Sequence, residues 1–153
     1  MLTYAIPGAS PIEVTYLVLD LNGTLTDGGR LIAGVGDRLT TLARDVEIHV
    51  VTADTHGSAA RTIADLPVSL LMIERGDDKA ALLDGLDPTR TVAIGNGRND
   101  AAMLRAAAIG IAVIGPEGAA GPAILAADVV CRSIVEALDL LLADRRLAST
   151  LRP

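Results

Sequence analysis

The chain has 153 residues, half of them hydrophobic, and a formal net charge of −6 at pH 7. It has two Tyr but no Phe or Trp, and nucleic acid binds to basic grooves and aromatic stacking surfaces, so this composition argues against a nucleic-acid partner. The length predicts one domain, residues 1–153, with a substantial core.

Cysteine usage and hydropathy predict a cytoplasmic protein. Cys131 is the only cysteine, which excludes an intramolecular disulfide and fits a reducing compartment. The most apolar segment, residues 106–115, is far shorter than the roughly 20 residues that a transmembrane helix needs. The N-terminus also lacks the basic region and apolar core of a secretory signal. We therefore expect no membrane partner.

Strand-like and helix-like patterns alternate along the chain. In chain order we expect strands at 2–6 and 14–19, a small hairpin at 26–32, a helix at 36–44, a strand at 47–51, a helix at 58–65, a strand at 68–73, a helix at 77–86, a strand at 91–94, a helix at 99–107, strands at 109–114 and 129–131, and a helix at 133–143. Such alternation favours parallel pairing with right-handed crossovers. The predicted fold is α/β, with a doubly wound, Rossmann-like and mostly parallel sheet.

The predicted strand at 14–19 indicates where the site lies. Its apolar run is typical of a strand buried on both faces, and it ends at Asp20. Asn22 and Gly23 then break the strand, so the carboxylate of Asp20 stands at its carboxyl tip. In open α/β sheets ligands bind outside these tips, where the strand order reverses.

Other polar residues follow the ends of other predicted strands or begin a helix. Thr52 follows the strand at 47–51, Lys79 opens a helix, and the loop 95–100 follows the strand at 91–94. Phosphoryl transfer needs this set: a carboxylate attacks phosphorus, a hydroxyl and an ammonium hold the phosphoryl oxygens, and magnesium neutralises charge. Asp20, the Asn22 carbonyl and Asp100 are candidate oxygen ligands for magnesium.

Four segments resemble the motifs of the haloacid dehalogenase (HAD) superfamily, in order. Residues 20–27, Asp-Leu-Asn-Gly-Thr-Leu-Thr-Asp, resemble the first motif, and Gly-Thr-Leu-Thr within them resembles the phosphorylation motif of P-type ATPases, which belong to that superfamily. Residues 50–54, Val-Val-Thr-Ala-Asp, are similar to the second, and Lys79 matches the third. Residues 95–104, Gly-Asn-Gly-Arg-Asn-Asp-Ala-Ala-Met-Leu, resemble the fourth. The nearest description is a stand-alone, soluble P-type ATPase-like protein.

The resemblance implies a magnesium-dependent phosphohydrolase or phosphotransferase that works through an aspartyl-phosphate, with a phosphorylated small molecule or phosphoprotein as substrate. It assigns residues to three roles: catalysis to Asp20 and to position 22, phosphate binding to Thr52, Ala53 and Lys79, and metal binding to Asp20, Asn22, Asn96 and Asp100. Segments 28–46 and 55–78 are too short to hold a cap domain. Capless relatives commonly use a neighbouring subunit as a lid, which implies a homo-oligomer.

Two asparagines depart from the family pattern. Most HAD phosphatases carry an aspartate, the general acid/base, where this chain has Asn22, and a metal-binding aspartate where it has Asn96. An amide does not exchange a proton at neutral pH, which removes a contribution of roughly 10²–10⁴-fold. We therefore expect slow turnover. The alternative is a catalytically weak HAD fold that serves as a binding or regulatory module.

Individual residues have other interpretations. Arg75 lies close enough in sequence to replace Lys79, and the pair Asn99-Asp100 also fits the N-cap of its helix. His49 lies within a strand and is predicted to be structural, whereas His56 follows the Thr52 loop and has access to the site or to solvent. A bacterial receiver domain shares the phosphorylatable aspartate, but its motifs come in a different order.

Overall fold

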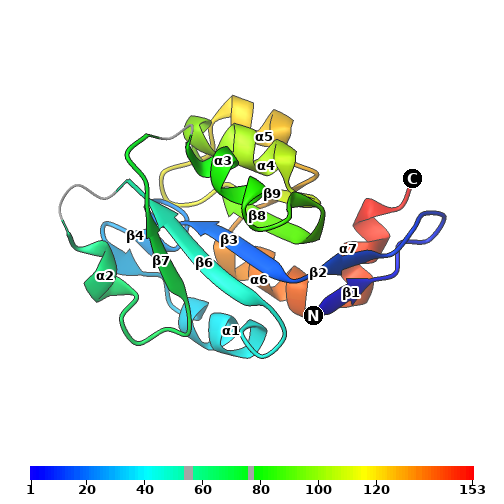
Figure 1. The fold of residues 1–153 in the computed structure, drawn as a ribbon, viewed down its shortest axis with the longest axis horizontal. Helices are drawn as coiled ribbons and strands as arrows, with labels where there is room; N and C mark the ends of the chain where they lie inside the picture. The colour runs from blue at the N-terminus through cyan, green and yellow to red at the C-terminus, as the bar shows by residue number, and fades with distance from the viewer. Residues whose placement is uncertain (54–56, 76–77) are drawn as a thin grey trace.

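The computed structural model describes residues 1–53, 57–75 and 78–153. At its centre is a six-stranded sheet with the order β10-β9-β8-β3-β6-β7 (Figure 1). The strands are β3 (Tyr16–Asp20), β6 (Glu47–Thr52), β7 (Ser69–Met72), β8 (Thr91–Gly95), β9 (Ile109–Val113) and β10 (Val129–Cys131). Every neighbouring pair is parallel, which confirms the predicted α/β fold and doubly wound sheet.

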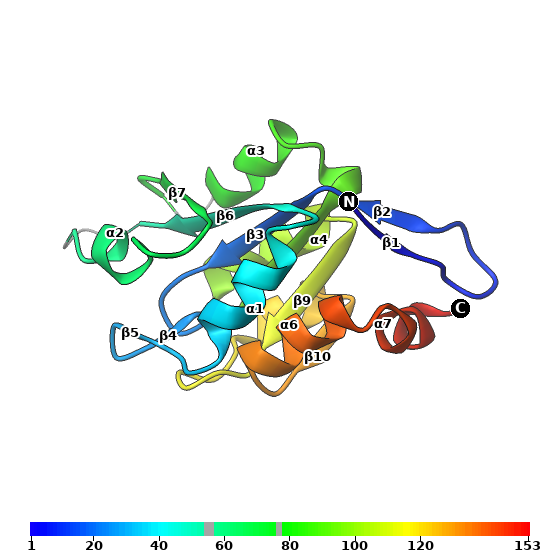
Figure 2. The same ribbon diagram turned by 90° about the horizontal axis from the view of Figure 1, so that it is seen from below.

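Helices cover both faces of this sheet, and Figure 2 shows α3 on the opposite side from α1 and α6. The helices are α1 (Val35–Leu42), α2 (Ala59–Thr62), α3 (Asp78–Asp84), α4 (Ala101–Ala106), α5 (Gly121–Ala126), α6 (Ile134–Leu142) and α7 (Asp144–Leu151), with 3₁₀ turns at Pro88–Arg90 and Arg98–Asp100. Along β3, Leu17 and Leu19 join the apolar cluster on one face and Val18 joins the cluster on the other. Burial on both faces explains the uninterrupted apolar run of this strand.

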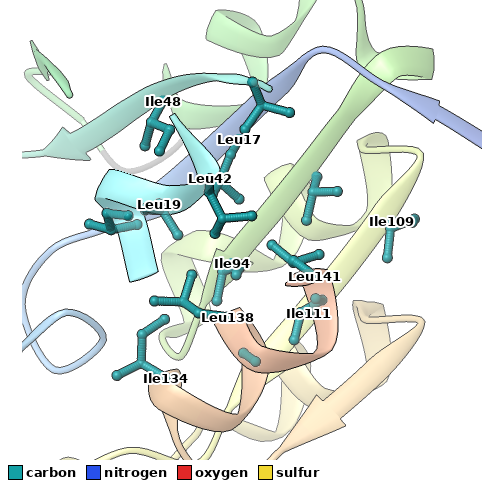
Figure 3. Close-up of a cluster of buried hydrophobic side chains, with 14 of the residues drawn as sticks. Leu17, Leu19, Leu42, Ile48, Ile94, Ile109, Ile111, Ile134, Leu138 and Leu141 are labelled. Carbon is teal, nitrogen blue, oxygen red and sulfur yellow. The ribbon is translucent and has the colours of Figure 1, made fainter. Parts of the chain in front are cut away.

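The larger apolar cluster lies between the sheet and helices α1 and α6 (Figure 3). Helix α6 faces it with side chains spaced three, four and seven residues apart, as an amphipathic helix should. They are Ile134, Ala137, Leu138 and Leu141. The helix begins after Ser133, whose Oγ accepts a hydrogen bond from the Glu136 N–H at 3.1 Å, so Ser133 is its N-cap.

The N-terminal segment differs from the sequence prediction. Strands β1 (Leu2–Tyr4) and β2 (Ile12–Val14) pair with each other as a separate antiparallel hairpin, so residues 2–6 are not an edge of the main sheet. The predicted strand at 14–19 was also too long, because it breaks at Thr15. The Thr15 N–H donates to the Arg90 carbonyl and its own carbonyl accepts from the Glu47 N–H, both at 2.9 Å, and the main sheet begins after it.

Helix α7 has no counterpart in the sequence prediction. This helix is the last element before the C-terminus. It packs beside β1, at the end of the molecule where the N-terminal hairpin projects (Figures 1 and 2). The hydroxyl of Tyr4 donates to the Leu141 carbonyl at 2.9 Å and fastens the hairpin to α6. No helix in the described part of the chain is long and apolar enough to cross a membrane.

The strand order reverses at β3. From β3 the chain moves outward through β6 and β7, then crosses to the other side of β3 to build β8, β9 and β10. Between β3 and β6 it forms only α1 and the predicted small hairpin, β4 (Thr26–Asp27) with β5 (Arg30–Leu31). Between β6 and α3 the described residues form only α2 and β7, so no cap domain covers the carboxyl ends of β3 and β8 there.

Candidate active site

The loop after β3 folds around one backbone carbonyl. The oxygen of Leu21 accepts hydrogen bonds from three N–H groups, those of Thr24, Leu25 and Thr26, at 2.9–3.3 Å. Gly23 makes this turn with a φ of +74°, a value that L side chains rarely adopt. The fold of the loop brings the Thr24 hydroxyl back to the strand tip, where it donates to Oδ2 of Asp20 at 2.9 Å.

Lys79, from the first turn of α3, crosses to the same strand tip. Its Nζ lies 2.6 Å from Oδ1 of Asp20 and 2.6 Å from Oδ1 of Asp100. Lys79 is 1% exposed, Asp20 is 8% exposed and Asp100 is fully buried. One ammonium therefore stands between two buried carboxylates, and the group carries excess negative charge when both are ionised.

The loop after β8 holds Asp100 in place. Its Oδ2 accepts hydrogen bonds from the backbone N–H groups of Asn96 at 3.0 Å and Gly97 at 2.8 Å. Since Oδ1 contacts Lys79, both carboxylate oxygens are engaged by this chain. Asp100 thus orients Lys79 and closes its own loop. It stands at the N-cap of α4 as predicted, but its side chain bonds N–H groups of the loop instead of N–H groups of the helix.

Asn96 links the two loops through its side chain. Its Oδ1 accepts from the Thr24 hydroxyl at 3.2 Å, and its Nδ2 donates to the Gly118 carbonyl at 3.1 Å. The Thr24 hydroxyl has one hydrogen and two acceptors, Oδ2 of Asp20 and Oδ1 of Asn96. These two oxygens therefore face the same point and keep unused acceptor capacity.

Two further predicted residues lie at the edge of this group. Thr52 ends β6 and is buried, and its Oγ1 is 3.5 Å from Nδ2 of Asn22, which is exposed at the mouth of the site. Ala53 follows Thr52 and is exposed. The structure thus brings the predicted site residues from four segments to one end of the sheet, while their roles in phosphate and metal binding stay predictions.

The structure also decides between residues that the sequence left open. Lys79, not Arg75, reaches Asp20, because Arg75 is exposed and its backbone N–H bonds Oδ2 of Asp78. His49 is buried within β6, opposite Val18 of β3, and its Nε2 lies 3.0 Å from a carboxylate oxygen of Glu47. Three predictions, Asp54 in the second motif, His56 near the site and the start of a helix at 77, lie outside the described residues.

The environment of the site raises the pKa of Asp20. Burial, and then repulsion from Asp100, raise the pKa of Asp20 to about 6, although Lys79 and the Thr24 hydroxyl act in the opposite direction. For Lys79, burial lowers the pKa, but the two carboxylates raise it by more, so its pKa lies above the usual value. Lys79 stays charged, and Asp20 is mostly ionised only above pH 6.

Two further residues at the site, Thr24 and Glu117, are not indicated by the sequence pattern. Thr24 lies inside the first motif, but only the fold of the loop reveals that its hydroxyl joins Asp20 to Asn96. Glu117 comes from the loop between β9 and α5, and its carboxylate covers the Cα of Gly23, so a side chain at position 23 would collide with it. The turn signal Gly-Pro-Glu-Gly at 115–118 was visible in the sequence, but nothing in the pattern linked it to Asp20.

The site offers a small number of oxygen ligands to a hard divalent cation. Among residues 1–53, 57–75 and 78–153, no three His, Cys, Asp or Glu side chains form a metal-binding group. The oxygens with unused capacity are instead Oδ2 of Asp20 and Oδ1 of Asn96, which share one hydroxyl hydrogen. Magnesium prefers oxygen ligands and often takes only one or two from protein while it keeps several waters, so this pair suits it.

Comparison with known proteins agrees with these observations. Residues 78–135, from α3 into α6, match the family model for haloacid dehalogenase-like hydrolases. The uncharacterised protein MJ0073 of Methanocaldococcus jannaschii is 51% identical over 63 residues, which are 41% of this chain and 68% of that protein.

Solved structures of HAD phosphatases share the fold. The cobalt-bound deoxy-D-mannose-octulosonate 8-phosphate phosphatase of Haemophilus influenzae superposes with a TM-score of 0.73 at 19% identity, over 89% of this chain and 91% of that one. The 3-deoxy-D-manno-octulosonate 8-phosphate phosphatase of Moraxella catarrhalis, in complex with magnesium, phosphate and its sugar acid, gives 0.68 at 20% identity, over 86% and 87%. With four motif segments gathered at one sheet edge and a family model that matches from Lys79 through Asp100, the chain belongs to the superfamily of haloacid dehalogenase-like hydrolases.

Proposed function

We propose that this protein is a magnesium-dependent phosphohydrolase or phosphotransferase in which Asp20 accepts the phosphoryl group. The observation that carries the proposal is the orientation of Asp20 at the point where the strand order reverses. Lys79 holds one of its oxygens and Thr24 the other, so the carboxylate is fixed before substrate arrives. Preorganisation of this kind lowers the barrier to an in-line attack.

The reaction would proceed in two steps. An oxygen of the Asp20 carboxylate attacks phosphorus, the bond from phosphorus to the leaving oxygen breaks, and the chain holds an acyl phosphate. In the second step water attacks this phosphoryl group, inorganic phosphate leaves, and the Asp20 carboxylate is regenerated. If an alcohol takes the place of water, the same step is a phosphotransfer.

Neighbouring groups of the chain would stabilise the transferred phosphoryl group. The hydroxyl of Thr52, the backbone at Ala53 and the ammonium of Lys79 are the proposed donors to its oxygens. Magnesium, held by Asp20, the Asn22 carbonyl and Asn96 with Asp100 in support, supplies charge neutralisation when bound. Lys79 already contacts Asp20 and stays charged, which suits it to follow negative charge from the carboxylate to the phosphoryl oxygens.

Two observations support a phosphate ester as substrate. The H. influenzae and M. catarrhalis proteins are phosphatases of a phosphorylated sugar acid, and one of them was solved with magnesium and phosphate. In this chain the described residues place no cap over the carboxyl ends of β3 and β8, which leaves access for a small molecule or for a phosphorylated side chain of another protein.

The second candidate function is a binding or regulatory module that carries the phosphoryl group without rapid release. Asn22 favours it, because this amide stands at the exposed mouth of the site, where the family has its general acid/base. The attack by Asp20 needs no proton removed once the carboxylate is ionised, whereas water needs a base. The first step is therefore expected to be faster than the second.

Turnover of a generic phosphate ester separates the two functions. With p-nitrophenyl phosphate and magnesium, the enzyme hypothesis predicts repeated turnovers that stop on addition of a chelator and are absent in Asp20→Asn. At most one phosphoryl group transferred per chain would support the module. Hydrolysis that continues unchanged in Asp20→Asn would reject both.

A further inference from the structure

A four-residue turn between β9 and α5, residues 115–118, lies directly on the Asp20 loop. The Gly118 N–H donates to the Gly115 carbonyl at 2.9 Å and closes the turn, which places Pro116 and Glu117 at its tip. A Cβ at position 115 would lie 2.6 Å from the Gly23 carbonyl oxygen, so the two loops are in contact.

Asn96 fixes this turn through two hydrogen bonds. Its side-chain Nδ2 donates to the Gly118 carbonyl at 3.1 Å, and its backbone carbonyl accepts from the Ala120 N–H at 2.8 Å. Asn96, which stands where the family has a metal-binding aspartate, therefore holds the turn that carries Glu117. An amide can make both side-chain contacts of Asn96 because it has an acceptor for Thr24 and a donor for Gly118.

The turn directs the Glu117 carboxylate toward the site. The space in which Gly23 would carry a Cβ is filled by this carboxylate, whose Cδ lies 2.8 Å from that point, while Nδ2 of Asn96 lies 3.1 Å from it. The Glu117 carboxylate and Nδ2 of Asn96 thus both lie close to the Cα of Gly23. Glu117 is exposed, so it reaches the site from its open side.

Glu117 has no counter-charge among the residues that the structure describes: no basic side chain there pairs with its carboxylate, and no donor hydrogen-bonds to it. The ammonium of Lys79 is already engaged by Asp20 and Asp100. A carboxylate held against a site that already has two carboxylates and one ammonium indicates that a cation belongs there.

A carboxylate at position 96 would be unfavourable while Glu117 keeps its charge. An aspartate in place of Asn96 would set an acceptor oxygen against the Gly118 carbonyl and a second negative charge beside Glu117. Asn96 and Glu117 therefore form a pair in which only one of the two positions carries the acid.

We propose that Glu117 supplies to the divalent-cation site the carboxylate that position 96 lacks, either as a direct ligand or through one bound water. The inference rests on the proposed magnesium-dependent function. It adds Glu117 as the residue that lets the site bind magnesium with an amide at position 96. The cation would lie among Oδ2 of Asp20, Oδ1 of Asn96 and the Glu117 carboxylate. All three are oxygen donors, as magnesium and manganese prefer.

Direct measurement of cation binding tests this inference without activity. Manganese is titrated into the parent, Glu117→Gln and the double variant Asn96→Asp/Glu117→Gln, with the fraction of free manganese followed by electron paramagnetic resonance. Glu117→Gln should weaken binding by roughly 10- to 100-fold, the range seen when groups that support a metal site are removed. The double variant returns a carboxylate to position 96 and should recover most of the affinity. Glu13→Gln, in β2 of the N-terminal hairpin, is the control and should bind as the parent does.

The outcomes separate the inference from the proposed function. If the parent binds manganese and Glu117→Gln binds it equally well, Glu117 is not part of the site and only the inference fails. The inference also fails if the double variant binds no better than Glu117→Gln while its circular dichroism matches that of the parent. If the parent itself binds no manganese or magnesium, the cation dependence of the proposed function fails along with it.

Discussion

Nζ of Lys79 lies 2.6 Å from Oδ1 of Asp20, inside a group that is almost closed to solvent. The same ammonium also contacts Asp100, so the site holds one more negative charge than positive charge when both carboxylates are ionised. Burial, and then repulsion from Asp100, raise the pKa of Asp20 to about 6 in spite of its ion pair. The stability of the protein and the reactivity of Asp20 should both depend on this balance.

Removal of the ammonium should destabilise the protein in a pH-dependent way. Lys79→Met leaves two buried carboxylates without a counter-charge, which costs about 3–5 kcal/mol when both are ionised. At pH 5 the loss should be smaller, because Asp20 can take up a proton. Urea unfolding at pH 8 and pH 5 measures the difference, and Lys79→Met/Asp20→Asn should recover part of the loss at pH 8. An equal loss at both pH values would contradict this account.

Asp20→Asn should stabilise the protein in the absence of divalent cations. Asp20 has a pKa of about 6 when folded and 3.8 as the reference value, so the folded state keeps a proton that the unfolded state has lost between these pH values. Parent stability contributed by this group therefore falls as the pH rises from about 4 to about 6. The variant should exceed the parent by roughly 2–3 kcal/mol above pH 6 and by little at pH 4. A pH-independent difference in unfolding free energy would reject the raised pKa.

The Thr24 hydroxyl should tune Asp20. Thr24→Val keeps the shape but removes the donor to Oδ2 of Asp20, which lowers stability by about 1–2 kcal/mol and raises the pKa of Asp20 further. The pH midpoint of phosphoryl uptake should then move upward. Thr24→Ser keeps the hydroxyl and is the control. If Val and Ser variants share the midpoint of the parent, this hydrogen bond has no part in setting the reactivity of Asp20.

Asn22→Asp should raise phosphatase turnover. The side chain is exposed and only 3.5 Å from Oγ1 of Thr52, so a carboxylate fits and gains a position from which to protonate a leaving group and deprotonate water. The gain could reach roughly 10²-fold, with magnesium present to offset repulsion from Asp20. Asn22→Ala controls for loss of the amide. A folded Asn22→Asp that is no faster than the parent at saturating magnesium would show that the acid/base argument is wrong.

Self-association is expected because the carboxyl edge of the sheet is open. Two apolar side chains near it, Met72 at the end of β7 and Ile114 directly after β9, are about half exposed and offer a surface to a second copy. A lid of this kind would exclude water and strengthen the electrostatics of the site. Light scattering at micromolar concentration should show a species larger than the monomer, reduced in Ile114→Lys. A monomer under all conditions would contradict the expectation.

The fold and the location of the site followed from local patterns. Apolar runs that end in polar residues predict buried strands with functional tips, and the alternation with helices predicts which tips lie on the same edge. Asp20 and Asn96 were found in this way, because Asp20 ends β3 and Asn96 comes directly after β8. Lys79 was named only as the opening residue of a helix, and nothing in a helix start alone indicates that its ammonium crosses to another strand.

What the sequence did not predict depends on contacts between distant segments. The break at Thr15 leaves no mark in the apolar run, because Thr15 bonds residues from distant segments: Glu47, the first residue of β6, and Arg90, which precedes β8. Helix α7 lacks the wide apolar stripe of α6, so local hydropathy does not reveal it. Glu117 and Gly23 lie far apart in the sequence, and no spacing in the sequence records their approach.

The phosphoryl group on Asp20 is the central claim, and intact mass spectrometry tests it most directly. The protein is incubated with acetyl phosphate and magnesium above pH 6, quenched in acid and weighed beside Asp20→Asn treated in the same way. The account predicts one added phosphoryl group on the parent, its loss on treatment with hydroxylamine, and none on the variant. An unmodified parent, or the same adduct on Asp20→Asn, would contradict it.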